Sequence, residues 1–178
     1  MKRINTSGQK KASNQPKVRI GFFAGSFDPL TLGHLDIIHR AANMFDRLVI
    51  GIGINSKKQP LLPIQSRLEI VATACRELAN VSVVSFEGLT VQTAKTFGAQ
   101  YLVRGLRSAD DLGYELQMFW TNRQLAPEID TTFIVTSQNY SHLSSTLVRE
   151  IVQLGGPITA MVPPIVSKKL ADIKGRKV

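Results

Sequence analysis

The sequence predicts a parallel α/β fold in which one five-stranded sheet carries helices on both faces. Short runs rich in β-branched and apolar residues alternate with amphipathic segments of helical period along the whole chain, which is typical of βαβ units. The chain has 178 residues, of which 43% are hydrophobic, so it can bury a real core within one domain. We expect this domain to span residues 18–178.

The first half of the chain shows the alternation clearly. The apolar run VRIGFFA predicts a strand at 18–24, and the near-helical spacing of apolar residues predicts a helix at 33–45. The run RLVIGIGI predicts the second strand at 47–54. A proline opens the helix predicted at 63–78, and VSVVSF predicts the third strand at 81–86.

The second half continues with two more β-rich runs, which predict strands at 99–105 and 130–137. Glycine or proline follows or closes most of the intervening helical patterns, as expected for helix ends. These helices are predicted at 90–98, 110–126, 144–156 and 162–173.

The net charge of +9 is concentrated at the two ends of the chain. Residues 1–17 carry five basic and no acidic residues, and residues 168–178 carry five basic residues and one acidic residue. The 12 basic and 12 acidic residues between these ends balance. We therefore predict that residues 1–17 form a disordered basic arm or are a remnant of expression, and that nucleic acid is not the main partner.

The sequence also indicates the compartment. No apolar run approaches the ~20 residues of a membrane span, and no apolar core of a secretory signal follows the basic N-terminus. The single cysteine, Cys75, cannot form an internal disulfide, and we expect it to pack inside the helix at 63–78. A cytoplasmic location without a membrane partner is expected.

Charged and polar residues follow four of the predicted strands, at the edge where parallel sheets bind ligands. After the first strand, the loop and helix start of GSFDPLTLGH suit a phosphate and bring His34 beside it. His39 lies in the middle of the same helix, where packing or solvation is the simpler explanation. Lys57 and Lys58 follow the second strand and could bind an anionic substrate.

The fourth and fifth strands end in further groups of this kind. Arg104 and Arg107 flank a glycine, and arginine is suited to bidentate phosphate contacts. Residues 144–146 are predicted both to cap a helix and to cradle a triphosphate. The chain contains no P-loop, dinucleotide fingerprint, zinc-type cluster or evident Ser-His-Asp spacing. Together these features predict a nucleotide-phosphate site.

Three motifs resemble a known family. GSFDPLTLGH resembles the (H/T)xGH signature of the nucleotidyltransferase superfamily, and RGLRSADDLGYELQMFWTNRQL resembles the second signature of bacterial phosphopantetheine adenylyltransferases. YSHLSSTLVREI resembles the third signature of that family. The resemblance runs from about Val18 to the C-terminus, and the RGLR helix is its specific element. It implies a dinucleotide-binding-like (Rossmann-type) fold and, typically, a homohexamer.

The resemblance also implies a reaction, the penultimate step of coenzyme A biosynthesis. ATP and 4′-phosphopantetheine would give 3′-dephospho-coenzyme A and pyrophosphate with Mg²⁺, which the ATP phosphates would mainly hold. His34 would stabilise the transition state, and Lys58 and Arg107 would add positive charge. Contacts to phosphopantetheine are implied for Ser26, Lys58, Thr90 and Arg104. Contacts to ATP are implied for Ser26, Phe27, His34, Gly105, Leu106, Arg107, Glu115, Tyr140, Ser141, His142, Leu143, Ser144, Ser145 and Thr146.

Three other functions stay open at this point. A nicotinate-mononucleotide adenylyltransferase would share the first and third motifs, and a CTP-dependent cytidylyltransferase for an alcohol phosphate is a more distant possibility. A non-catalytic nucleic-acid-binding module would use the basic tails. Three positions depart from the family pattern: Ser26 stands where many members have Thr, Leu32 where some have Asn, and Thr90 where some have an apolar residue. Lys57 could take the place of Lys58.

Overall fold

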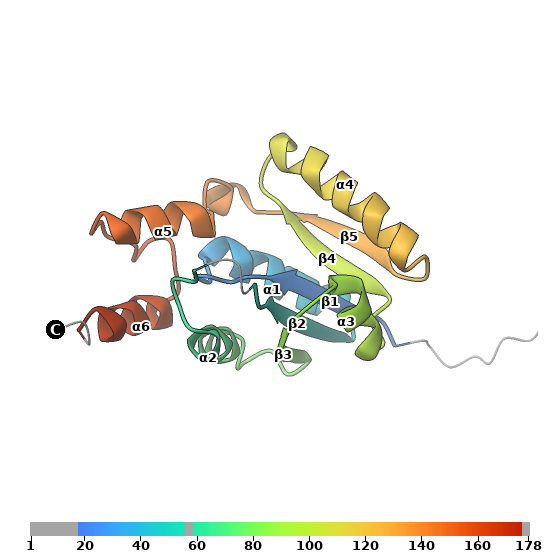
Figure 1. Cartoon of the computed structure of the whole chain (residues 1–178), viewed down its shortest axis with the longest axis horizontal. Coiled ribbons are helices and arrows are strands. Elements are labelled where there is room, and N and C mark those ends of the chain that lie inside the picture. Colours follow the sequence, from blue (N-terminus) through green and yellow to red (C-terminus); the bar gives the residue numbers. More distant parts are fainter. Residues whose placement is uncertain (1–17, 56–58, 176–178) are drawn as a thin grey trace, which may run out of the picture.

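The computed structural model describes residues 18–55 and 59–175, and in this part of the chain all five predicted strands are present. The predicted N-terminal arm, Lys57 and Lys58 lie outside the described residues. All strand pairs are parallel, in the order β3-β2-β1-β4-β5 (Figure 1). The strands are β1 (Ile20–Gly25), β2 (Arg47–Gly53), β3 (Val81–Phe86), β4 (Tyr101–Leu106) and β5 (Asp130–Val135).

The helices follow the strands as predicted, with one short addition before the fifth α-helix. They are α1 (Leu32–Met44), α2 (Ile64–Ala74), α3 (Thr90–Thr96), α4 (Ala109–Leu125), the 3-10 helix η1 (Gln138–Tyr140), α5 (Ser145–Gln153) and α6 (Pro164–Gly175). Within the described ranges, none of these helices is long and apolar enough to cross a membrane.

Alternating side chains of the strands enter two separate cores, which confirms that helices cover both faces of the sheet. Phe23 packs in one cluster with apolar residues of α1, α2, α5 and α6, whereas Phe22 packs in the other with residues of α3. Successive residues of a strand point to opposite faces, so the apolar run of β1 serves both. Gly51 in β2 makes room for this packing, because a Cβ there would lie 2.3 Å from the Phe22 ring.

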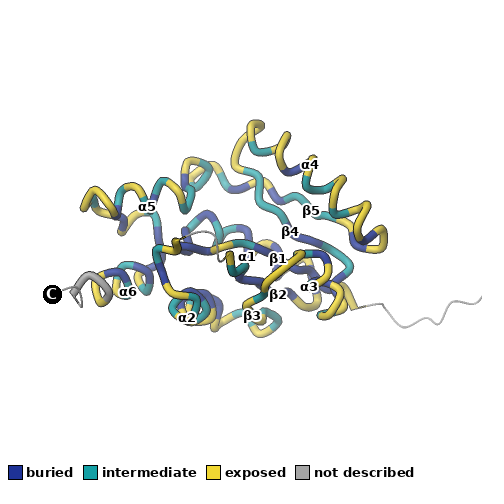
Figure 2. Tube along the Cα trace, in the orientation of Figure 1, coloured by how far each residue is buried: buried dark blue, intermediate teal, exposed yellow. Residues whose placement is uncertain are grey.

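Helix α4 is attached to the rest of the chain differently. Only Glu115 is buried among its 17 residues, and large apolar side chains such as Trp120 (61% exposed) face outward. Figure 2 shows this helix almost entirely in the colours of exposed and intermediate residues. Burial of apolar surface is normally the main force that holds a helix on a sheet. For α4 that force is weak within the single chain, and the helix is also joined to Arg104 of β4 and to Arg107 after it by ion pairs.

Two predicted helix ends are wrong by more than two residues. The helix predicted at 63–78 ends at Ala74, because the chain turns there to reach β3 and Asn80 Nδ2 donates to the carbonyls of Ala42 and Phe45. Cys75 is therefore the C-cap residue, although it is buried as predicted. The helix predicted at 144–156 ends at Gln153, shortly before Gly155 adopts a φ of 78°.

The strand order indicates which edge of the sheet carries the functional site. Chain order runs outward from β1 to β3 in one direction and from β4 to β5 in the other, so the order reverses between β1 and β4. In parallel sheets a crevice opens at such a switch point, beyond the carboxyl ends of the strands. The residues that follow β1 and β4 lie at this crevice.

Candidate active site

A cavity of about 290 Å³ opens at the carboxyl ends of β1 and β4. The residues that follow β1, β4 and β5 meet there, as the sequence predicted for three of its four strand-end groups. The predicted site residues in its lining are Phe27, His34, Arg104, Gly105, Arg107, Glu115, Leu143, Ser144, Ser145 and Thr146. The cavity therefore brings together most of the groups expected to handle ATP.

His34 lies in the first turn of α1, where Thr31 caps the helix. The backbone N–H of Thr31 donates to His34 Nδ1 over 3.0 Å, and the Thr31 hydroxyl lies 3.0 Å from the same nitrogen. Because Nδ1 accepts a backbone hydrogen bond, the proton of the neutral imidazole resides on Nε2. The loop thus assigns His34 the role of a donor through Nε2–H.

The protonation state of His34 agrees with this role. Burial, and to a smaller extent the positive charge of Arg107, lowers the pKa of His34 to about 4. The ring also packs against Phe27, with the two ring centroids 5.1 Å apart. Phe27 is fully buried with a φ of 45°, an uncommon backbone conformation for a bulky residue. A neutral, fixed imidazole is the result.

The position of the Phe27 ring requires a glycine at position 25. A Cβ at Gly25 would lie 3.0 Å from the Phe27 ring, which is closer than side chains normally approach. The absence of a side chain at Gly25 therefore leaves room for the aromatic ring that packs against His34.

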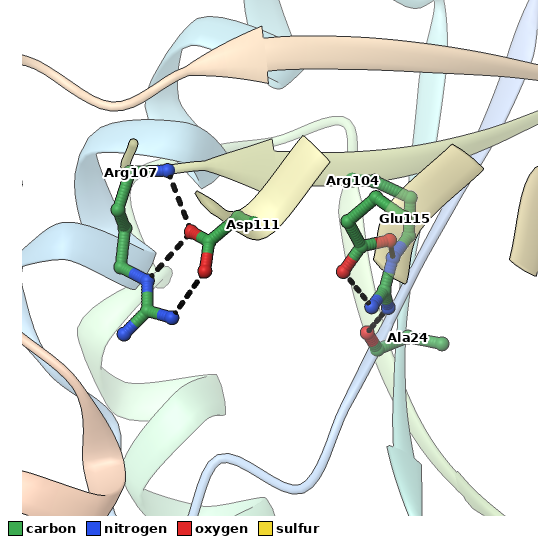
Figure 3. Close-up of polar contacts among 5 residues, drawn as sticks. All are labelled: Ala24, Arg104, Arg107, Asp111 and Glu115. Carbon is green, nitrogen blue, oxygen red and sulfur yellow. Dashed lines mark hydrogen bonds and ion pairs between the residues drawn. The ribbon is translucent and has the colours of Figure 1, made fainter. Parts of the chain in front are cut away.

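Arg104 in β4 and Arg107 directly after it are each held by a carboxylate of α4 (Figure 3). Arg104 donates from Nε and Nη2 to Glu115 over 2.7 and 2.6 Å, and from Nη1 to the carbonyl of Ala24 over 3.1 Å. Arg107 donates from Nε and Nη2 to Asp111 over 2.9 and 2.6 Å. Both guanidinium groups are therefore oriented before any ligand binds, which lowers the cost of binding a phosphate.

The N-terminus of α5 forms another wall of the cavity. Ser144 is the N-cap, as predicted, and its Oγ accepts from the backbone N–H of Leu147 over 3.0 Å. The Ser145 hydroxyl donates to the carbonyl of Pro29 over 2.9 Å, so its proton is already used. Among the described residues the Ser144 hydroxyl has no acceptor for its own proton, and Thr146 is exposed. Together with the helix dipole, these groups favour an anion.

Some predicted site residues lie elsewhere. Ser26 lines a second cavity of about 680 Å³, and Thr90 lines a third of about 190 Å³, which Arg104 shares. Lys58 is outside the described residues. Four remaining predicted contacts line none of these three cavities, and they stay predictions: Leu106, Tyr140, Ser141 and His142.

Three residues of the site were missed by reasoning from the sequence. Thr31 orients His34, and Asp111 holds Arg107. Buried Asp28 accepts from the backbone N–H groups of Leu61 and Leu62 over 2.8 Å each, and from Arg149 over 2.7 Å. The Thr31–His34 spacing of a capping box and the i,i+4 spacing of Arg107 and Asp111 are signals that could have identified the first two.

The titratable groups around the cavity do not resemble a metal centre. Among the described residues, no group of three or more His, Cys, Asp or Glu side chains could hold a metal ion. The two carboxylates nearest the site, Asp111 and Glu115, already accept hydrogen bonds from arginines. Protein side chains in the described part of the chain therefore do not form a cage for Mg²⁺.

Comparison with known proteins covers most of the chain. The sequence model of the family described as cytidylyltransferase-like matches residues 22–151. A phosphopantetheine adenylyltransferase of Lachnoclostridium phytofermentans is 48% identical over 87% of this chain and 95% of its own length. The protein of the same name from Gloeobacter violaceus is 50% identical over 85% of this chain and 94% of its own length.

A solved structure supports the fold. A putative nicotinate-nucleotide adenylyltransferase from Vibrio parahaemolyticus matches with a TM-score of 0.66 over 87% of this chain and 93% of its own. The two sequences are only 20% identical, so this likeness concerns the Rossmann-like architecture alone. The predicted fold class is confirmed.

Proposed function

The chain belongs to the phosphopantetheine adenylyltransferases, within the cytidylyltransferase-like family, and we propose how the first and third cavities serve the reaction of that family. The enzyme is a nucleotidyltransferase of coenzyme A biosynthesis that transfers the adenylyl group of ATP to 4′-phosphopantetheine. The products are 3′-dephospho-coenzyme A and pyrophosphate. The observation that carries the site proposal is the convergence of His34, Arg107 and the α5 N-terminus on one cavity.

The chemistry needs charge stabilisation more than proton transfer. A phosphate oxygen of the acceptor attacks the α-phosphorus of ATP, the new P–O bond forms, and the bond to pyrophosphate breaks. Because the nucleophile is already an anion, no strong general base is needed, and positioning and electrostatics supply most of the rate. We propose that the Nε2–H of His34 donates to the α-phosphate as charge develops.

Arg107 and the N-terminus of α5 would hold the polyphosphate of ATP. The Nη1 side of the Arg107 guanidinium has no hydrogen-bond partner among the described residues. The N-terminus of α5, with the Ser144 hydroxyl, would provide further donors in the same cavity. Fixed donors around a phosphate chain stabilise the charge that develops during phosphoryl transfer.

The third cavity supports the assignment of the acceptor. Thr90 and Arg104, both implied contacts of phosphopantetheine, line it together with Tyr114, Met118 and Asn122. Arg104 also lines the first cavity, so it stands between the two. We propose that the acceptor phosphate lies at Arg104 and that the pantetheine arm follows the third cavity, whose polar and apolar walls suit its amides and methylenes.

Mg²⁺ is proposed to enter with ATP, held by the phosphates. The described residues offer no set of carboxylates for it, so no step is assigned to a protein-bound metal. Bound to a polyphosphate, the ion would neutralise part of the charge on the leaving group.

We also propose that the enzyme is a homohexamer of the cytoplasm. Leu112, Leu116 and Trp120 form an exposed stripe at i, i+4 spacing along α4, and they are 39%, 37% and 61% exposed. An apolar stripe on a helix with one buried residue is typical of a surface that another subunit covers. The expected occupant is a second copy of this chain.

One assay tests the activity. The purified protein is supplied with ATP and 4′-phosphopantetheine, and pyrophosphate release is measured. Nicotinate mononucleotide as the acceptor and CTP as the donor serve as comparisons. Pyrophosphate release is expected only when ATP is the donor and 4′-phosphopantetheine is the acceptor. Faster release with nicotinate mononucleotide, or dependence on CTP, would overturn the assignment.

A further inference from the structure

Asp111 lines the first cavity, but it is not among the site residues that the resemblance implies. It lies in the first turn of α4, four residues after Arg107, and lines the cavity. Its carboxylate accepts three hydrogen bonds from Arg107, from the backbone N–H and Nε over 2.9 Å each and from Nη2 over 2.6 Å. Figure 3 shows the two side chains facing each other across the end of β4.

We propose that Asp111 is a positioning residue that holds Arg107 by one edge of its guanidinium and thereby turns the other edge toward the polyphosphate of ATP. This proposal rests on the proposed function. Asp111 itself would not touch the reacting atoms. It would act through Arg107.

Arg107 needs such a support because nothing else fixes it. Its side chain is 42% exposed, and within the described part of the chain every hydrogen bond of its guanidinium goes to Asp111. A long exposed side chain without a partner samples many rotamers, and ordering it on binding is costly. The pair removes that freedom in advance.

The choice of edge also matters. A guanidinium can meet an anion with its Nε–Nη2 edge or with its Nη1–Nη2 edge. Asp111 takes the first edge through both of its oxygens, so the second edge is left to face a phosphate. Arg104 is held in the same manner by Glu115, one turn further along α4. Two carboxylates at i,i+4 thus orient two arginines at the cavity.

Asp111 should give ATP little net gain in binding, because its charge offsets the advantage of ordering Arg107 in advance. Its negative charge opposes that of the polyphosphate and partly neutralises Arg107. If the residue at position 111 served only to bind the polyphosphate, a cationic side chain or a neutral hydrogen-bond donor would serve better there. The physical gain from Asp111 is therefore in the geometry of the transition state, and its loss should appear in kcat more than in KM.

The test substitutes Asp111→Asn and measures pyrophosphate release. The amide keeps the side-chain shape, but its nitrogen cannot accept from Nη2. We expect kcat to fall by about 10- to 100-fold, the cost of a misplaced catalytic group, with the KM for ATP unchanged or lower. Asp110→Asn is the matched control, because Asp110 is exposed on the same helical turn and should leave both constants near wild type.

A double-substitution cycle separates positioning from a general structural effect. In the Arg107→Ala background, Asp111→Asn should change kcat no further, since Asp111 acts only through that arginine. An additional loss there, or an unchanged kcat in the single variant, overturns the proposal. If Asp111→Asn does not fold, Asp111→Glu, which shifts the guanidinium by one methylene, should still lower kcat, and an unchanged kcat in that variant overturns the proposal. Inactive wild-type protein would instead count against the proposed function.

Discussion

His34 should remain neutral throughout the neutral pH range, and this prediction can be worked out from its surroundings. Burial, then the charge of Arg107, lowers the pKa of His34 to about 4, from 6.5 for an unperturbed histidine. In the unfolded chain the imidazole takes up its proton near pH 6.5. Between these two values the unfolded state binds more protons, so the free energy of unfolding rises with pH and falls as the solution is acidified.

The magnitude follows from the size of the shift. Lowering the pH from about 7 to about 4.5 should cost about 2 kcal/mol of stability through His34 alone, since each unit of pKa difference is worth about 1.4 kcal/mol. The stability lost through His34 is nearly zero above pH ~7, where the imidazole is neutral in both the folded and the unfolded protein. The loss is largest below pH ~4, where the imidazole is protonated in both.

Urea denaturation of the wild type and of His34→Gln at both pH values measures this contribution. Glutamine does not titrate, whereas every other ionisable group is common to the two proteins. The wild type should therefore lose about 2 kcal/mol more than the variant between the two pH values. Equal losses would refute the assignment of a buried neutral imidazole, and with it the role of Nε2–H as an uncharged donor.

Three further outcomes are expected. His34→Ala should lower kcat by about 10²- to 10³-fold with little change in the KM for ATP, because it removes one oriented donor to developing charge; steady-state kinetics test this. Arg104→Ala should raise the KM for phosphopantetheine by about 10-fold or more, and more than that for ATP. In the double variant Arg104→Ala/Glu115→Gln, the carboxylate that Arg104→Ala leaves without its partner is removed as well. The KM for phosphopantetheine should again rise more than the KM for ATP, and equal increases for both substrates would contradict the division of roles. Trp120→Glu should reduce the mass seen by analytical ultracentrifugation, whereas Leu154→Glu, at an exposed position outside α4, should not.

The edge of the sheet that carries the site was predictable. In a parallel sheet all carboxyl ends lie on one side, so residues that follow different strands must share that side. His34, Arg107 and Ser144 were expected there for this reason, and all three line the first cavity. The capping role of Ser144 could also be predicted from the sequence, because it depends only on a few neighbouring residues.

The partners of the charged groups were not predictable in the same way. The resemblance implied Glu115 only as a contact of ATP, and it did not predict that Glu115 is buried and that both its oxygens accept hydrogen bonds from Arg104. Asp28 was a loop residue in the first motif, yet it joins the loop after β1 to Arg149, which is 121 residues away. Such pairings depend on how the elements dock, which local spacing does not encode.

Local periodicity determined the number, type and order of the elements, because backbone hydrogen bonding and the alternation of apolar side chains involve residues only a few positions apart. Tertiary structure alone decided that β1 lies beside β4, where the carbonyl of Ala24 accepts a hydrogen bond from Arg104, 80 residues away. That contact joins β1 to β4, and residues of both strands line the cavity with His34. The burial of His34 lowers its pKa to about 4, so this histidine is a neutral donor.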